Sequence, residues 1–316
     1  MLDEEARPLA ARIEVAEAGP LSLLVAPTPA DRRRVEALPG DTISLQLLVA
    51  SSERLWSTES LDPVWLACEG PDCLLGFSEA RLHTPCDSPL AFFDGCAIGR
   101  GADARLRVPL PDLTRSFAAP TVFAVAGVPG ENTTDACVQA ITHRPPPSLR
   151  GCAIIARSVR YGPTWVIQAL LGSVDPEHPT PPEELLQQPN FNPEVERFSV
   201  RIGSAGATAI DARAGDTIAV EAGDDVWVDF ESDPRDAQRH VVGVDATGHV
   251  TRNVEFVGVQ WYASTALEGI ATSFIPNQHF VVPDDVDVVR LDLVVDDSNG
   301  GVGWGSLTFE VADGAP

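Results

Sequence analysis

Aspartate side chains at expected turns and strand ends are the residues most able to bind a metal. Asp233 with Asp236 and Asp296 with Asp297 are the best candidate pairs, and Ca²⁺ takes about six to eight oxygen ligands from such groups. If loops at one end of a domain converge, these four aspartates could share a calcium ion. The alternative is that they form turns and a solubilising surface, because the whole chain is acidic. No EF-hand spacing is present. Calcium is the candidate cofactor at these aspartates.

The six cysteines all lie between Cys68 and Cys152, and the second half of the chain has none. An even number in one loop-rich region predicts disulfides formed in an oxidising compartment. Pairing between neighbours in sequence is favoured, which joins Cys68 with Cys73, Cys86 with Cys96, and Cys137 with Cys152. Zinc is the alternative, because it accepts the ligand types at Cys68, Cys73, His83 and Cys86. Their spacing fits no common zinc finger or ribbon.

Patterns for catalysis are missing from the sequence. It contains neither a Gly-x-Ser-x-Gly nucleophile turn nor a His-Glu-x-x-His pattern, and its six histidines are scattered. We therefore predict no catalytic residues and no enzymatic activity. Among the aromatic residues, Trp304 stands beside glycines near the last turn and is expected to contact a ligand or partner. Trp227, Trp261 and Tyr262 are expected in the core, because they lie on strands.

The charge of the chain limits its partners. The 46 acidic residues outnumber the 22 basic ones, all of which are arginines, so the formal net charge is -24. This negative charge repels phosphate backbones and anionic lipid headgroups, so nucleic acid is not an expected partner. Basic surfaces are the expected partners. The run Arg32-Arg33-Arg34 is the one basic cluster. We expect a solvated strand edge or loop there rather than a binding patch.

Several features indicate an exported protein of the periplasm, outer membrane or cell surface. Met1 is the only methionine, as if a start codon preceded a mature sequence. No stretch reaches the roughly 18 consecutive apolar residues that a membrane helix needs. We expect that a signal peptide, or a lipidated cysteine upstream of Leu2, was removed, and that lipid anchor is the only membrane link that we expect.

Alternation of apolar and polar residues predicts an all-β chain with two domains. The first domain spans residues 9–172 and carries the cysteine-rich insertion, a proline-rich linker with a short helix spans 173–193, and the second domain spans 194–313. In the first domain we expect a helix over 132–141 and strands over 11–15, 21–25, 41–50, 63–68, 104–110, 121–128, 151–158 and 164–171. About seven strands are expected in the second, and the last two form a hairpin around the turn 297–301.

An internal repeat links the two domains. The segment 37–45 recurs as 212–220, and both copies contain Gly-Asp-Thr-Ile at the start of an alternating strand. Glycine supplies the turn geometry, and the aspartate can accept hydrogen bonds from nearby backbone N–H groups. The repeat predicts two sandwiches of related type in tandem.

Several sequence features of the second domain resemble those of a known domain family. With its Gly-Asp-Thr-Ile strand, the turn Glu231–Asp236, the Trp261 strand and the closing hairpin, the second domain resembles PKD-type immunoglobulin-like domains. The whole chain resembles exported, often lipid-anchored cell-envelope proteins of high-GC bacteria such as myxobacteria, in which Asn-Pro-x-Val, here Asn192–Val195, starts a strand. The long segment 238–253 and the irregular stretch 263–269 depart from the PKD pattern and leave the strand order open.

The resemblance implies tandem Ig-like antiparallel β-sandwiches, the first with a disulfide-tied loop region and a short helix. It implies a non-catalytic structural or protein-binding role, with other envelope or surface proteins as partners. The alternatives are a carbohydrate-binding or enzyme-accessory module and, less favoured, a hydrolase.

Overall fold

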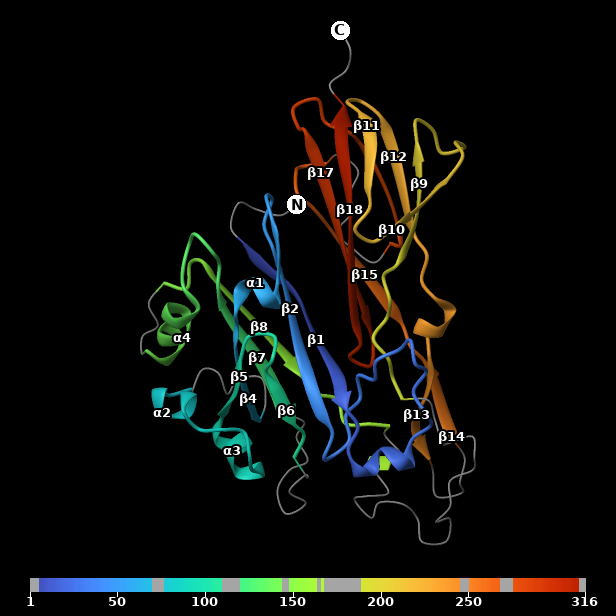
Figure 1. Cartoon of the computed structure of the whole chain (residues 1–316). Coiled ribbons are helices and arrows are strands. Elements are labelled where there is room, and N and C mark those ends of the chain that lie inside the picture. The colour runs from blue at the N-terminus through green and yellow to red at the C-terminus, as the bar shows by residue number, and fades with distance from the viewer. Residues whose placement is uncertain are drawn as a thin grey trace.

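The computed structural model describes residues 6–69, 77–109, 120–143, 148–163, 166–167, 189–244, 250–267 and 275–312. Strands make up 47% of the structure and helices 13%, so the predicted all-β class is confirmed. Two β-sandwiches lie against each other, a first lobe in residues 6–167 and a second lobe in residues 189–312 (Figure 1).

The first lobe contains two four-stranded sheets. Sheet 1 consists of β1 (Arg7–Glu17), β2 (Thr42–Ala50), β3 (Leu55–Ser57) and β6 (Arg105–Arg107), and the other three strands all pair with β2. Sheet 2 has the order β5 (Cys96–Arg100), β4 (Val64–Glu69), β7 (Pro120–Gly127), β8 (Cys152–Ser158). All of these pairings are antiparallel.

Every second residue of β2 faces the hydrophobic core of the first lobe. Ile43, Leu45 and Leu47 of β2 are buried at 2% exposure or less and pack towards Trp65 of β4 and Ala124 of β7. The intervening residues of β2 face the other way, as alternation along a strand requires. The sequence prediction of strand 41–50 is therefore confirmed together with its inward face.

Short helices cover the first lobe. They are η1 (Pro20–Leu24), α1 (Thr58–Leu61), α2 (Glu79–Leu82), α3 (Pro89–Asp94) and α4 (Thr134–Thr142). The strand predicted over 21–25 is wrong, because η1 occupies it as a 3-10 helix with Pro20 in its first turn. The predicted helix 132–141 is α4, whose Val138 and Ile141 pack with Phe123 and Val125 of β7.

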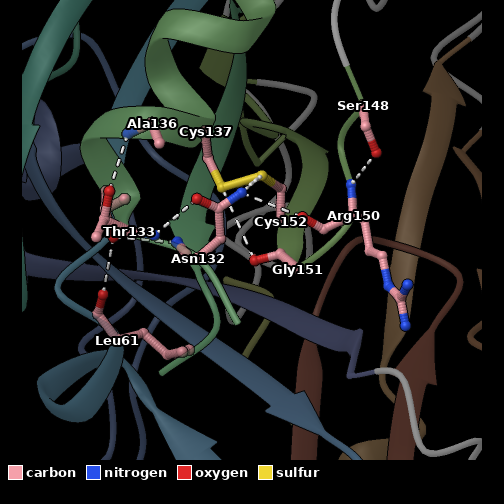
Figure 2. Close-up of a disulfide and its surroundings, with 11 residues drawn as sticks. Leu61, Asn132, Thr133, Ala136, Cys137, Ser148, Arg150, Gly151 and Cys152 are labelled. Carbon is pink, nitrogen blue, oxygen red and sulfur yellow. Dashed lines mark hydrogen bonds between the residues drawn. A yellow bond between two sulfur atoms is a disulfide. The ribbon is translucent and has the colours of Figure 1, made fainter. Parts of the chain in front are cut away.

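Figure 2 shows how a disulfide ties α4 to the start of β8. The Thr133 hydroxyl caps the helix by accepting from the N–H of Ala136 (3.2 Å), and Asn132 Nδ2 donates to the Arg150 carbonyl (3.1 Å). The predicted pairs Cys137–Cys152 and Cys86–Cys96 are both present. Cys68 is also disulfide-bonded, whereas Cys73, its predicted partner, lies outside the described residues.

The second lobe is also a sandwich. Sheet 3 has the order β10 (Ile210–Arg213), β9 (Arg197–Ile202), β12 (Asp225–Phe230), β16 (Asn277–Val281). Sheet 4 has the order β11 (Thr217–Glu221), β18 (Val302–Ala312), β17 (Val288–Asp297), β15 (Val257–Ala263). The predicted closing hairpin is β17–β18, and Trp261, with 1% exposure, packs 6.1 Å from Phe198 between ring centroids.

Two features of the second lobe were not predicted. The segment 238–253, which the sequence treats as an insertion, contributes β13 (Arg239–Val244) and β14 (Val250–Val254), which pair as a hairpin. The short β10 pairs with β9. The predicted helix of the proline-rich linker lies outside the described residues. Of the predicted strand 164–171, the structure describes residues 166–167, and the prediction is wrong there because they are helical.

The sequence repeat produces the same turn twice. The N–H of Leu38 donates to Asp41 Oδ2 and the N–H of Arg213 donates to Asp216 Oδ2, both at 2.7 Å. Gly40 and Gly215 have φ values of +91° and +93°, which favour glycine. The following strands pair differently, because β2 is antiparallel to its neighbours while β11 is parallel to β18. The local repeat therefore fixes the turn and not the sheet.

We predict that replacing Cys137 and Cys152 together by serine lowers the free energy of unfolding by about 3 kcal/mol, since the disulfide closes a loop of 15 residues. Urea denaturation of oxidised protein measures the difference. A double variant as stable as the wild type would mean that the bond adds nothing to the packing of α4 on β7.

Candidate interaction surface between the lobes

The outer face of sheet 4 packs on β1 and β2 of the first lobe, and Figure 1 shows β1 alongside β18. Ala10 and Leu48 from the first lobe form one buried cluster with Val294 and Val302 from the second. Because apolar burial contributes roughly 25 cal/mol per Å², this patch favours a fixed arrangement of the two sandwiches.

Trp304 extends this contact. The Arg12 guanidinium lies 4.5 Å from the centroid of the indole ring, a distance typical of a cation–π contact. Arg12 Nε also donates to Gln46 Oε1 (3.0 Å) and pairs with Glu14 (3.1 Å). The sequence predicts a ligand or partner contact for Trp304, and the structure gives this half-buried ring a contact with the first lobe of the same chain.

Arg32 joins the lobes by ion pairs. Its Nη1 donates to Asp236 Oδ1 (2.7 Å) and its Nη2 to Asp233 Oδ2 (2.9 Å), the last residue and the N-cap of η4 (Pro234–Asp236). The side chains of Arg32 and Asp236 are 2% and 1% exposed. The expectation that the arginine run is solvated is therefore wrong for Arg32, and also for Arg34, which is buried against Asp41. Only Arg33 of the run is exposed.

All four candidate calcium ligands contact protein donors. Asp233 and Asp236 hold Arg32, and Asp296 pairs with Arg157 (2.9 Å) across the lobes. Asp297 accepts from the N–H groups of Asn299 (2.7 Å) and Gly301 (2.8 Å) within its own turn. Within the described ranges, no group of three or more His, Cys, Asp or Glu side chains is placed to hold a metal ion.

Carboxylates from both lobes also meet around Asn190. Its backbone N–H donates to Glu36 (3.1 Å), and its side-chain amide donates to Asp297 (3.2 Å). Asn299 Nδ2 donates to Glu255 Oε1 (2.9 Å) beside it. Glu36, Asn190 and Glu255 were not selected from the sequence, because they are far apart along the chain and belong to no motif.

Burial controls the protonation of these acids. It raises the pKa of Glu36 to about 7 and that of Glu255 to about 8. The pKa of Asp297 is also raised, first by burial. The Asp297 charge raises the pKa of the other two further, while Arg34 and Arg160 act in the opposite direction on Glu36.

Beside the apolar patch, the lobes leave a cleft of about 400 Å³. It is lined by residues of β1 and β8 from the first lobe and of β15, β17 and β18 from the second. Among the described strands, β1, β8 and β15 each form an edge of their sheet. Phe256, 63% exposed, lies in the lining immediately before β15. Three sheet edges and an exposed aromatic ring therefore meet at one place.

No protein-family model and no curated protein matches this chain. No helix in the described part of the chain is long and apolar enough to cross a membrane. The disulfides indicate an oxidising, extracellular type of environment.

We predict that Arg32→Met lowers the free energy of unfolding by roughly 3 to 5 kcal/mol, because it leaves the buried Asp236 carboxylate without its cation. The exposed neighbour provides the control, and Arg33→Met should change stability by less than about 0.5 kcal/mol. Equal effects of the two substitutions in urea denaturation would contradict the role of the buried pair.

The raised pKa of Glu36 makes the stability of the fold depend on pH. Its pKa in the folded protein is about 7 against an ordinary value of 4.5, so the folded state keeps a proton that the unfolded state loses. Protonated Glu36 contributes fully to the stability of the fold below pH 4.5, and this contribution is lost as the pH rises to about 7.

The unfolding free energy of the wild type should therefore fall between about pH 5 and about pH 8, and this fall should be smaller in Glu36→Gln. The reduction is about 3 kcal/mol, since one unit of pKa corresponds to about 1.4 kcal/mol. Urea denaturation across this range tests it, with the exposed Glu53→Gln as control. Parallel pH profiles of wild type and Glu36→Gln would disprove the assignment.

Proposed function

We propose that this chain is an exported, non-catalytic cell-envelope protein with a structural or protein-binding role. The interlobe cleft receives an extended segment of a partner protein. The observation that carries the proposal is the convergence of three sheet edges, β1, β8 and β15, on that cleft.

A sheet edge presents backbone N–H and C=O groups that an added strand can pair with. The cleft residues of sheet 4 lie on its outer face, because Gly258 and Gln260 alternate with the core residues Val259 and Trp261. An incoming strand can therefore pair with the β15 edge while its side chains contact Phe256.

Charge favours a basic partner segment. The chain carries a net charge of -24, and Asp296 in the cleft lining is 47% exposed despite its pair with Arg157. A partner segment that alternates apolar and basic residues would place its apolar side chains on the cleft wall and its basic side chains towards the negatively charged surface.

The compartment is part of the same proposal. Disulfides persist in the periplasm and at cell surfaces, and an envelope protein meets partners there. The lipid anchor suggested by the resemblance would attach the chain to a membrane without a spanning helix.

Carbohydrate binding is the second candidate, and one observation favours it. Trp227 is half-buried and lies on the outer face of sheet 3 and not in the core as predicted, and it stacks on His279 with ring centroids 4.5 Å apart. His279 Nε2 lies 2.8 Å from Asp225, and Arg201 pairs with Asp229 on the same face. Aromatic and polar groups of this kind can contact a sugar, although the described residues supply one ring pair there instead of a row.

The test uses a short fluorescein-labelled peptide of alternating valine and arginine. We expect micromolar binding by fluorescence anisotropy, together with slower hydrogen exchange of the amides of β15, because a strand added at this edge protects them. Phe256→Ser and Ala156→Trp, which remove the ring and fill the cleft, should weaken binding about tenfold or more.

Controls separate strand addition from charge attraction. A peptide with proline in place of every second valine lacks donors for the ladder, and an alternating valine and glutamate peptide reverses the charge. Neither should bind, whereas Trp227→Ala should bind like wild type. Equal binding of the proline peptide, or unchanged binding by both cleft variants, would refute the proposed function.

A further inference from the structure

The first lobe contains a second and larger cavity, of about 820 Å³. This volume lies in the range of roughly 300 to 1,000 Å³ that ligand pockets occupy. The cavity lies where the edge strand β5 of sheet 2 faces the edge strand β6 of sheet 1, so Ile98 and Arg107 line the same space.

The walls of the cavity are apolar. Four prolines contribute to them and offer no N–H donor, and the aliphatic residues Leu21, Ile98 and Val108 add further apolar surface. The prolines are Pro20, Pro39, Pro85 and Pro109. A ligand that fills this space must therefore have an apolar body, because these walls cannot replace the hydrogen bonds of a polar one.

Separate contacts hold two of the walls in place. The Cys86–Cys96 disulfide ties the segment around Pro85 to β5, and the N–H of Ala97 donates to the Thr84 carbonyl (2.7 Å). On the opposite side, the buried Asp41 accepts from the N–H of Gly19 (2.6 Å), which fixes the start of η1. A pocket held in this way loses little entropy when a ligand enters.

Two arginines supply the polar part of the lining. Arg105 and Arg107 are exposed and flank the buried Leu106 on β6, so they share one face at a Cα spacing of roughly 6.6 Å. Arg105 Nη1 donates to the carbonyls of Ala102 (2.7 Å) and Ala104 (2.9 Å). Asp87 is the only acidic residue in the described lining.

These charges favour an anion locally. The net charge of the chain is -24, but at roughly 0.15 M ionic strength charges further away than about 8 Å are largely screened. The nearest charged groups then determine the local electrostatic potential, which is positive because two arginines outweigh one aspartate. Arginine binds a carboxylate through two parallel hydrogen bonds, which suits a carboxylate ligand.

We propose that this cavity binds a single-chain aliphatic carboxylate, with the hydrocarbon against the proline-rich walls and the carboxylate on Arg105 and Arg107. The site is independent of the interlobe cleft. The cysteine-rich insertion then has a role beyond stabilisation, because its Cys86–Cys96 disulfide shapes one wall of the site.

Isothermal titration calorimetry with dodecanoate below its micelle concentration tests the proposal. We expect saturable binding by wild type, and binding about tenfold weaker or worse for the double variant Arg105→Gln, Arg107→Gln. Acetate, which lacks the chain, and dodecyltrimethylammonium, which reverses the charge, should bind far more weakly than dodecanoate. Arg213→Gln, an exposed arginine of the second lobe, should bind like wild type.

Two filling variants locate the ligand. Ile98→Trp and Leu21→Trp enter the cavity from opposite walls, and each should abolish binding; a melting curve confirms that the variant used is folded. Ala156→Trp, in the interlobe cleft, should leave dodecanoate binding unchanged, so failure here is distinguishable from failure of the peptide experiment. Equal affinity for dodecyltrimethylammonium, or unchanged affinity in the arginine double variant or in a folded filling variant, would overturn the proposal.

Discussion

The Arg32 guanidinium lies out of water between the lobes, where Asp233 and Asp236 neutralise its charge. A charge in this position is costly unless its partners are held in place. Separating the sandwiches would leave Asp236 without its cation and would expose the apolar cluster around Ala10 and Val302. The relative placement of the lobes therefore depends on this pair, and so does the cleft between them.

The same junction also buries two acidic side chains, Glu36 and Glu255. Burial and the nearby Asp297 raise the pKa of Glu36 to about 7 and that of Glu255 to about 8, so both carboxyls take up protons close to neutral pH. Hydrogen bonds from Asn190 and Asn299 orient these carboxyls. The junction thus combines a buried ion pair, which favours one arrangement of the lobes, with protonated acids, whose contribution to stability declines as the pH rises.

Edges of sheets create both proposed binding sites. Sandwiches leave edge strands, and here β1, β8 and β15 meet at the interlobe cleft, while β5 and β6 face each other across the larger cavity. The first site offers backbone hydrogen bonds and so suits a polypeptide. The second is walled by proline and aliphatic side chains and so suits a hydrocarbon chain with one charged end.

Local patterns in the sequence determined the all-β class, most strands, the helix α4, the two disulfides that the structure describes and the repeated Gly-Asp turn. Each of these depends on residues close in the chain, because strand alternation, helix capping and short disulfide loops are local constraints. Only the tertiary structure decided that Arg32 is buried, that Trp304 contacts Arg12 and that the candidate calcium ligands bind protein donors. Arg32 and Asp236 are 204 residues apart, and no local pattern specifies which charges meet when two sandwiches pack together.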